Sequence, residues 1–144
     1  MTNKLYISWN EFHQDVKNLA QKIKEHGHFN RIIAVSRGGL IPAGILSYEL
    51  DIRQCDSVNI QTYDATQQRA ADDIVVDNKL EAADTQTLIV DDLSDSGQTF
   101  QILQKLFPNA CRVAVYAKPN GKKDTNIFAR TLPDQWVVFP WDIE

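Results

Sequence analysis

The sequence predicts an α/β fold in which helices flank a central, mainly parallel sheet. Short β-branched apolar runs alternate with longer segments of helical periodicity, which is typical of a parallel sheet with crossover helices. Small, polar or charged residues follow the apolar runs directly. In such a sheet, ligands bind at the carboxyl ends of the strands, so these residues are the first candidates for a site.

Composition supports one folded domain that spans residues 1–144. The chain is 43% hydrophobic and 24% charged, which is typical of a globular protein. The net charge is −4 without a basic block, which argues against nucleic-acid binding. The apolar runs are too short to span a bilayer, and no signal region precedes the first predicted helix. We therefore expect a cytoplasmic protein.

The first half of the chain predicts two helices and two strands. Ser8 and Glu11 form a capping box, and apolar residues at helical spacing follow until Gly27. A β-branched run, Arg31–Ser36, reads as a strand buried on both faces. In order, the expected elements are a helix at about 9–25, a strand at 31–36, a helix at about 41–50 and a strand at 56–63.

Residues 64–84 are polar and acidic apart from Ile74, Val75 and Val76, and predict a mobile lid loop that contains a small hairpin. A third buried strand is expected at 87–90, a loop at 91–97, a helix at 98–107 and a fourth strand at 111–117. The tail, 118–144, carries aromatic residues and prolines without helical periodicity, and predicts short strands or an irregular cap.

The strongest motif runs from Asp91 to Thr99. A buried strand ends in two adjacent carboxylates, and a short loop with Gly97 then opens a helix. The helix N-terminus and the hydroxyls of Ser96 and Thr99 offer donors to a phosphate. The carboxylates would repel a phosphate, but they suit the vicinal hydroxyls of a sugar and a Mg²⁺ ion. Together these groups describe a receptor for ribose 5-phosphate; the alternative is an ordinary acidic cap of the helix.

A second motif, Ser36 to Gly39, follows the strand at 31–36. An Arg-Gly-Gly sequence is more often an ordinary turn. At the end of a neighbouring parallel strand, however, it places a cation and free amides opposite the ribose site.

These two motifs resemble the type I phosphoribosyltransferases, whose signature is a hydrophobic strand, two acidic residues and a D-x-G-x-T-like loop. The match includes Asp91, Asp92, Asp95, Gly97 and Thr99. Nearly the whole chain resembles the bacterial xanthine–guanine phosphoribosyltransferases, through residues 35–40, 63–64, 117–119, 134–136 and 140–142. The resemblance implies the type I fold, with a small C-terminal hood at roughly 118–144 and a lid at roughly 64–84.

The resemblance also assigns a role to each candidate residue. The ribose and its 5′-phosphate would be bound by Asp91, Asp92, Leu93, Ser94, Asp95, Ser96, Gly97, Gln98 and Thr99. The pyrophosphate would be bound by Ser36, Arg37, Gly38 and Arg69, with a non-proline cis peptide near Ser36–Arg37. The purine would be bound by Asp95, Lys118, Trp136 and Val137. Mg²⁺ would contact Asp92, with Asp142 as a second candidate.

Within this set, Asp95 is the catalytic candidate because its carboxylate can accept or relay a purine proton at N7. Lys118 would donate to the purine 6-oxo group. Each residue also has an ordinary alternative: a lysine after a strand is usually solvated, Trp136 and Val137 suit a core under the cap, and Arg69 suits an exposed loop. One departure from the family is Ser94-Asp95-Ser96, where Val-Asp-Thr is more usual.

The expected reaction is Mg²⁺-dependent transfer of the 5-phosphoribosyl group from phosphoribosyl pyrophosphate to N9 of guanine or xanthine, and more weakly hypoxanthine, in purine salvage. Two alternatives stay open. One is a hypoxanthine-preferring enzyme, and the other is a catalytically weak, nucleotide-sensing regulator on the same fold. The resemblance further implies a homo-oligomer, either a dimer or a tetramer. The resemblance alone also implies peripheral association with the inner membrane.

Overall fold

The structure, a computed structural model, describes residues 3–61, 75–76 and 84–144. The predicted lid at 64–84 lies outside these residues except for Val75, Val76 and Asp84, and Arg69 lies outside them as well. None of the helices in the described ranges is long and apolar enough to cross a membrane.

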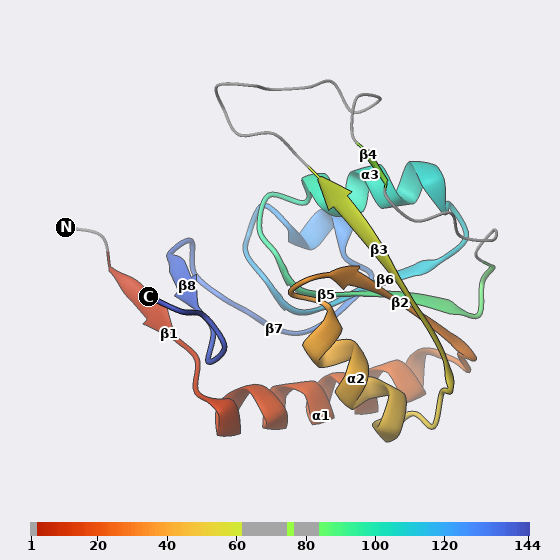
Figure 1. The fold of residues 1–144 in the computed structure, drawn as a ribbon, viewed down its shortest axis with the longest axis horizontal. Coiled ribbons are helices and arrows are strands. Elements are labelled where there is room, and N and C mark those ends of the chain that lie inside the picture. The colour runs from red at the N-terminus through yellow and green to blue at the C-terminus, as the bar shows by residue number, and fades with distance from the viewer. Residues whose placement is uncertain (1–2, 62–74, 77–83) are drawn as a thin grey trace.

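A mainly parallel sheet forms the centre of the molecule (Figure 1), as the sequence predicts. Five strands run parallel, and a sixth, short strand pairs antiparallel at one edge. In spatial order the strands are β4 (Val75–Val76), β3 (Gln54–Gln61), β2 (Arg31–Ser36), β5 (Thr87–Ser94), β6 (Cys111–Ala117) and β7 (Ile127–Thr131).

Helices cover both faces of this sheet. Helices α1 (Trp9–His26) and α2 (Leu40–Glu49) lie on one face, and α3 (Gln98–Leu106) lies on the other. The central strands are buried on both sides, since Ile32 packs into the first core and Ile33 into the second. This arrangement explains why β2 and β5 read as continuous apolar runs rather than as alternating ones. The predicted capping box is present, with Glu11 N donating to Ser8 Oγ at 3.1 Å.

The two termini meet in a second, two-stranded sheet. The N-terminus does not run directly into α1; it first forms a short strand, β1 (Lys4–Tyr6), that pairs in parallel with β8 (Trp136–Val138). The tail forms the short strands that the sequence predicts: Ile127–Thr131 is an edge strand of the main sheet beside β6, and β8 lies outside that sheet. We call β1 and the segment 132–144, which contains β8, the hood.

The strand before the predicted loop is also longer than expected. β5 continues to Ser94 because β6 provides backbone partners as far as the pairs Leu93↔Tyr116 and Ser94↔Ala117. Asp91 to Ser94 therefore belong to the strand, and the turn into α3 consists of residues 95–97. At the other edge, Val75–Val76 pairs antiparallel with β3, and the rest of the predicted hairpin lies outside the described residues.

Candidate active site

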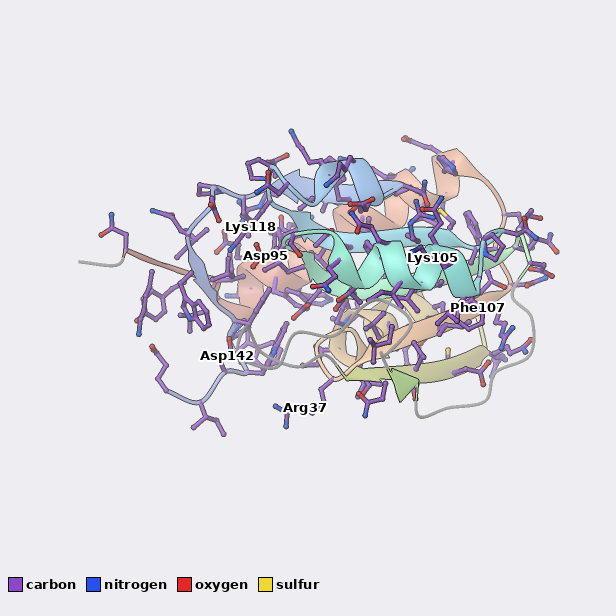
Figure 2. All side chains as sticks on the ribbon, turned by 90° about the horizontal axis from the view of Figure 1, so that it is seen from above. Arg37, Asp95, Lys105, Phe107, Lys118 and Asp142 are labelled. Carbon is purple, nitrogen blue, oxygen red and sulfur yellow. The ribbon has the colours of Figure 1, made fainter. Side chains whose placement is uncertain are left out.

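The candidate residues gather where β2, β5 and β6 end. Arg37 follows β2, Asp95 follows β5 and Lys118 follows β6. Figure 2 shows Asp95 and Lys118 near each other, with Asp142 and Arg37 lower in the view, whereas Lys105 and Phe107 lie towards the far end of α3. The parallel sheet thus brings together residues from distant parts of the sequence at its carboxyl edge.

A pocket lies between the end of β5 and the N-terminus of α3. Eight of the nine residues predicted to cradle ribose 5-phosphate line it, and Phe100 joins them: Asp91, Leu93, Ser94, Asp95, Ser96, Gly97, Gln98, Thr99 and Phe100. The first N–H groups of a helix have no partner within the helix, so α3 offers donors to an anion in this pocket.

The turn into α3 is tightly built around Gly97, which has a φ of 89°, in the left-handed region. A Cβ at this position would overlap the carboxylate of Asp124. Asp124 also accepts a hydrogen bond from Gln101 Nε2 at 3.1 Å, which ties the first turns of α3 to the segment after β6. Sequence reasoning did not identify Asp124, because no local pattern places residue 124 beside residue 97.

Asp92 is the one residue of the predicted 91–99 cradle that does not line the pocket. Its carboxylate lies against Gly38 in the turn after β2, where a Cβ would overlap both of its oxygens. The peptide bond between Ser36 and Arg37 is cis, as the resemblance implies, and the Arg37 side chain is exposed. The predicted pyrophosphate turn and the predicted metal ligand are therefore in direct contact.

The two adjacent carboxylates are electrostatically costly in the free protein. Burial raises the pKa of Asp91 well above its ordinary value, and the negative charge of Asp92 raises it further. Burial also raises the pKa of Asp92, and Asp142 contributes in the same direction. Asp142 is held by a 2.8 Å hydrogen bond from Phe139 N to its Oδ2. A cation at this position would favour the charged forms of these groups.

This donor set fits Mg²⁺, which binds proteins through one or two carboxylates and takes its other ligands from water and substrate phosphates. Asp92 and Asp142 are within electrostatic reach of each other, although they come from β5 and the hood. Within the described residues, no group of three or more histidine, cysteine or acidic side chains forms a complete metal cage. The residues present suit an ion that arrives with its substrate.

Lys118 is buried rather than solvated, since only 6% of its surface is exposed. Its Nζ donates to Asp95 Oδ2 at 3.3 Å and lies 3.9 Å from Asp134 Oδ1. A buried ammonium group needs such partners, and the carboxylate side chains of both acids are largely exposed. Asp134 was not predicted as a site residue, because only the folded hood places it beside Lys118.

The two predicted purine-pocket residues of β8 lie in different environments. Trp136 is 66% exposed, so it is not part of a core under the hood. Val137 is buried and packs in the core cluster that includes Phe139, so the ordinary structural alternative holds for its side chain. The indole of Trp136 thus offers an accessible aromatic face, of the kind on which flat rings stack.

Comparison with known proteins agrees with this geometry. Residues 6–144 match the family model described as the phosphoribosyl transferase domain. The fold is similar to a solved purine phosphoribosyltransferase from Pyrococcus horikoshii Ot3, with a TM-score of 0.81, 26% sequence identity, and coverage of 98% of this chain and 95% of that one. The chain therefore belongs to the phosphoribosyltransferase family.

Within that family, the chain is similar to xanthine-guanine phosphoribosyltransferases. The protein of that name from Idiomarina loihiensis is 42% identical over 143 residues, which cover 97% of this chain and 88% of the relative. The one from Desulfotalea psychrophila is 37% identical over 139 residues, which cover 96% and 86%. This chain belongs to the xanthine-guanine phosphoribosyltransferase group.

Proposed function

We propose that this protein transfers the 5-phosphoribosyl group from phosphoribosyl pyrophosphate to N9 of guanine or xanthine, and more weakly hypoxanthine, in purine salvage. The observation that carries the proposal is the buried Lys118, whose Nζ lies 3.3 Å from Asp95 Oδ2 next to the cradle pocket. A fixed cation and a carboxylate at the rim of a ribose 5-phosphate receptor are the pair that a 6-oxopurine requires. The names of the relatives support the same substrates.

In this proposal the nine residues 91–99 hold the ribose and its 5′-phosphate. The amides at the start of α3, with Ser96 and Thr99, bind the phosphate, while Asp91 and Asp92 bind the ribose hydroxyls. Asp92, with Asp142 near it, would hold Mg²⁺, which when bound offsets charge on the pyrophosphate. Ser36, Arg37 and Gly38 bind the pyrophosphate from the other side, and Arg69 would join them.

The reaction needs little covalent chemistry from the protein. The bond between C1 and the pyrophosphate oxygen breaks as the bond to N9 forms, through an oxocarbenium-like state. The protein holds donor and base in line and stabilises the departing anion, chiefly with Arg37. Asp95 accepts or relays the proton at purine N7, and Trp136 stacks on the base beside Val137.

Lys118 explains why adenine would be rejected. Its ammonium donates to the 6-oxo oxygen of guanine, xanthine or hypoxanthine. Adenine presents an amino donor at the same position, so two donors would face each other without an acceptor. The discrimination between 6-oxopurines and adenine therefore follows from one side chain that donates hydrogen bonds but cannot accept them.

The test is pyrophosphate release with Mg²⁺, phosphoribosyl pyrophosphate and each of guanine, xanthine, hypoxanthine and adenine. We expect release with guanine and xanthine, slower release with hypoxanthine, and none with adenine. A clear preference for hypoxanthine would replace the proposal with the hypoxanthine-preferring alternative. No release with any base would favour the nucleotide-sensing regulator. The homo-oligomer, the cytoplasmic location and the peripheral membrane association stay predictions.

A further inference from the structure

Ser94, the last residue of β5, holds both ends of the turn that carries Lys118. Its side-chain Oγ donates to the carbonyl of Gly121 at 3.1 Å, and its backbone carbonyl accepts from Lys118 N at 3.0 Å. The turn itself is closed by Gly121 N, which donates to the carbonyl of Lys118 at 2.9 Å. Ser94 is 4% exposed, so these hydrogen bonds are shielded from water.

The contact between Ser94 and Gly121 is close. A Cβ on Gly121 would overlap the backbone carbonyl of Ser94. The Gly121 carbonyl also accepts a second hydroxyl, that of Thr125, at 2.8 Å, and Thr125 is 7% exposed. One carbonyl with two buried hydroxyl donors fixes the position of the turn more firmly than a single hydrogen bond would.

The consequence concerns the purine side of the site. Asp95 directly follows Ser94, and Lys118 begins the turn that Ser94 holds, so the position of Ser94 sets the 3.3 Å approach between Lys118 Nζ and Asp95 Oδ2. We infer that Ser94 is a positioning residue for purine recognition, acting through its hydroxyl on the turn 118–121. This inference rests on the proposed function, in which Lys118 and Asp95 contact the base.

This role differs from the one predicted for Ser94, which was contact with ribose 5-phosphate. Because the hydroxyl is engaged with Gly121, its loss should affect the base more than the phosphoribosyl donor.

The first test is Ser94→Ala, which removes the hydroxyl but keeps the backbone bond to Lys118. We expect the KM for guanine to rise about threefold to tenfold, which is the equilibrium effect of one neutral hydrogen bond. The KM for phosphoribosyl pyrophosphate should rise less than the KM for guanine. Thr125→Val removes the other hydroxyl on the same carbonyl and should act in the same direction, with a larger effect in the double variant.

The matched control is Thr87→Val, at the opposite end of the same strand. Thr87 is 1% exposed, and its hydroxyl donates to Asp84 Oδ1 at 3.1 Å, so the variant loses a hydroxyl hydrogen bond from the same strand at the end away from the turn 118–121. It should leave the KM for guanine unchanged. Equal effects of Ser94→Ala and Thr87→Val on that KM, or an equal effect of Ser94→Ala on the KM of both substrates, would overturn the inference.

The second test does not depend on activity. Hydrogen exchange in the ligand-free protein should be about threefold to tenfold faster at the Lys118 and Gly121 amides in Ser94→Ala than in the wild type, with α1 unchanged. Unchanged exchange at both amides would overturn the tether itself. A wild-type protein that releases no pyrophosphate overturns the proposed function and the purine role, whereas the exchange rates still decide whether Ser94 holds the turn.

Discussion

Asp91 and Asp92 illustrate a conflict between stability and binding at the scale of single residues. Two adjacent, partly buried carboxylates repel each other, and burial disfavours the charged form of both. A core strand that ends in this way is costly unless a ligand uses the charges. The ribose hydroxyls and Mg²⁺ of the proposed reaction provide that use.

The raised pKa of Asp91 makes the stability of the ligand-free protein depend on pH. As the pH rises past about 4, Asp91 ionises in the unfolded chain but stays protonated in the folded one, so the free energy of unfolding falls until the folded pKa is passed. Asp91→Asn removes this loss of stability. Its amide oxygen still offers an acceptor to Asp92 N, which in the wild type donates to Asp91 Oδ1 at 2.8 Å.

We therefore expect Asp91→Asn to have a higher Tm than the wild type at pH 7 and an equal Tm near pH 4, while its affinity for phosphoribosyl pyrophosphate falls. Thermal unfolding at several pH values, with and without the donor and Mg²⁺, measures both effects. A lower Tm for the variant at pH 7 would show that the Asp91 charge is not a burden on the free protein.

Lys118 carries the second prediction at this scale. Lys118→Met keeps the length of the side chain and its buried contacts but removes the donor, so the purine 6-oxo group loses its charged partner. We expect kcat/KM for guanine to fall about 100-fold and its ratio to that for adenine to fall with it, while the KM for phosphoribosyl pyrophosphate stays within about twofold.

Lys105→Met is the control for Lys118→Met, because Lys105 lies in the last turn of α3, away from the candidate site. It should leave all of these constants unchanged. If Lys118→Met retains full discrimination against adenine, another group must read the 6-oxo oxygen.

At the scale of elements, local signals predicted most of the fold, and non-local pairing explains the differences. The capping box at Ser8 fixes the start of α1, and continuous apolar runs identify β2 and β6, because these signals lie within a few residues. β1 has three residues and exists through its pairing with β8, more than 130 positions away. Similarly, β5 extends over Asp91–Ser94 because β6 lies beside it.

The candidate site divides in the same way. The pocket between β5 and α3 could be predicted because one continuous segment lines it. Asp124, Asp134 and the Ser94–Gly121 tether could not, because each depends on which segments the sheet and the hood place side by side. For Asp92 and Gly38, the sequence predicted that the ends of their two strands lie opposite each other, but it did not predict the contact between the two residues.

The turn into α3 supplies the prediction at the scale of elements. Gly97→Ala places a Cβ at a φ of 89° and against the carboxylate of Asp124. A left-handed conformation costs about 1–2 kcal/mol for such a residue, and the overlap forces the loop to move. We expect a loss of about 1–3 kcal/mol of stability and a KM for phosphoribosyl pyrophosphate at least about tenfold higher.

Gly44→Ala is the matched control, because a Cβ at that position in α2 meets no atom within 4 Å. It should gain about 0.5–1 kcal/mol through helix propensity and leave both KM values unchanged. Denaturant unfolding and pyrophosphate release measure the two variants together. If Gly97→Ala binds the donor normally, the amides of the turn do not form the phosphate site.

At the scale of the whole molecule, the two halves of the proposed substrate pair are held by different parts of the structure. The donor side rests on β2, β5 and α3, which share the buried sheet. The purine side depends partly on the hood, where β8 carries Trp136 and Val137 and is paired to β1. Stacked Phe139 and Trp141, with ring centroids 4.7 Å apart, and the edge-on Phe12 anchor the hood to α1.

This division predicts that loosening the hood affects the two substrates unequally. A chain without residues 1–6 loses β1, and β8 keeps the hydrogen bond from Ile7 N to the carbonyl of Val138 at 3.0 Å. Because β8 would then be an unpaired edge, we expect the KM for guanine to rise about tenfold while the KM for phosphoribosyl pyrophosphate changes less than twofold.

Lys4→Ala is the control, since it removes only the exposed pair with Glu144 and should change neither constant. Equal losses for both substrates in the shortened chain would mean that β1 stabilises the whole site, and the hood would then not be a separate purine-binding unit.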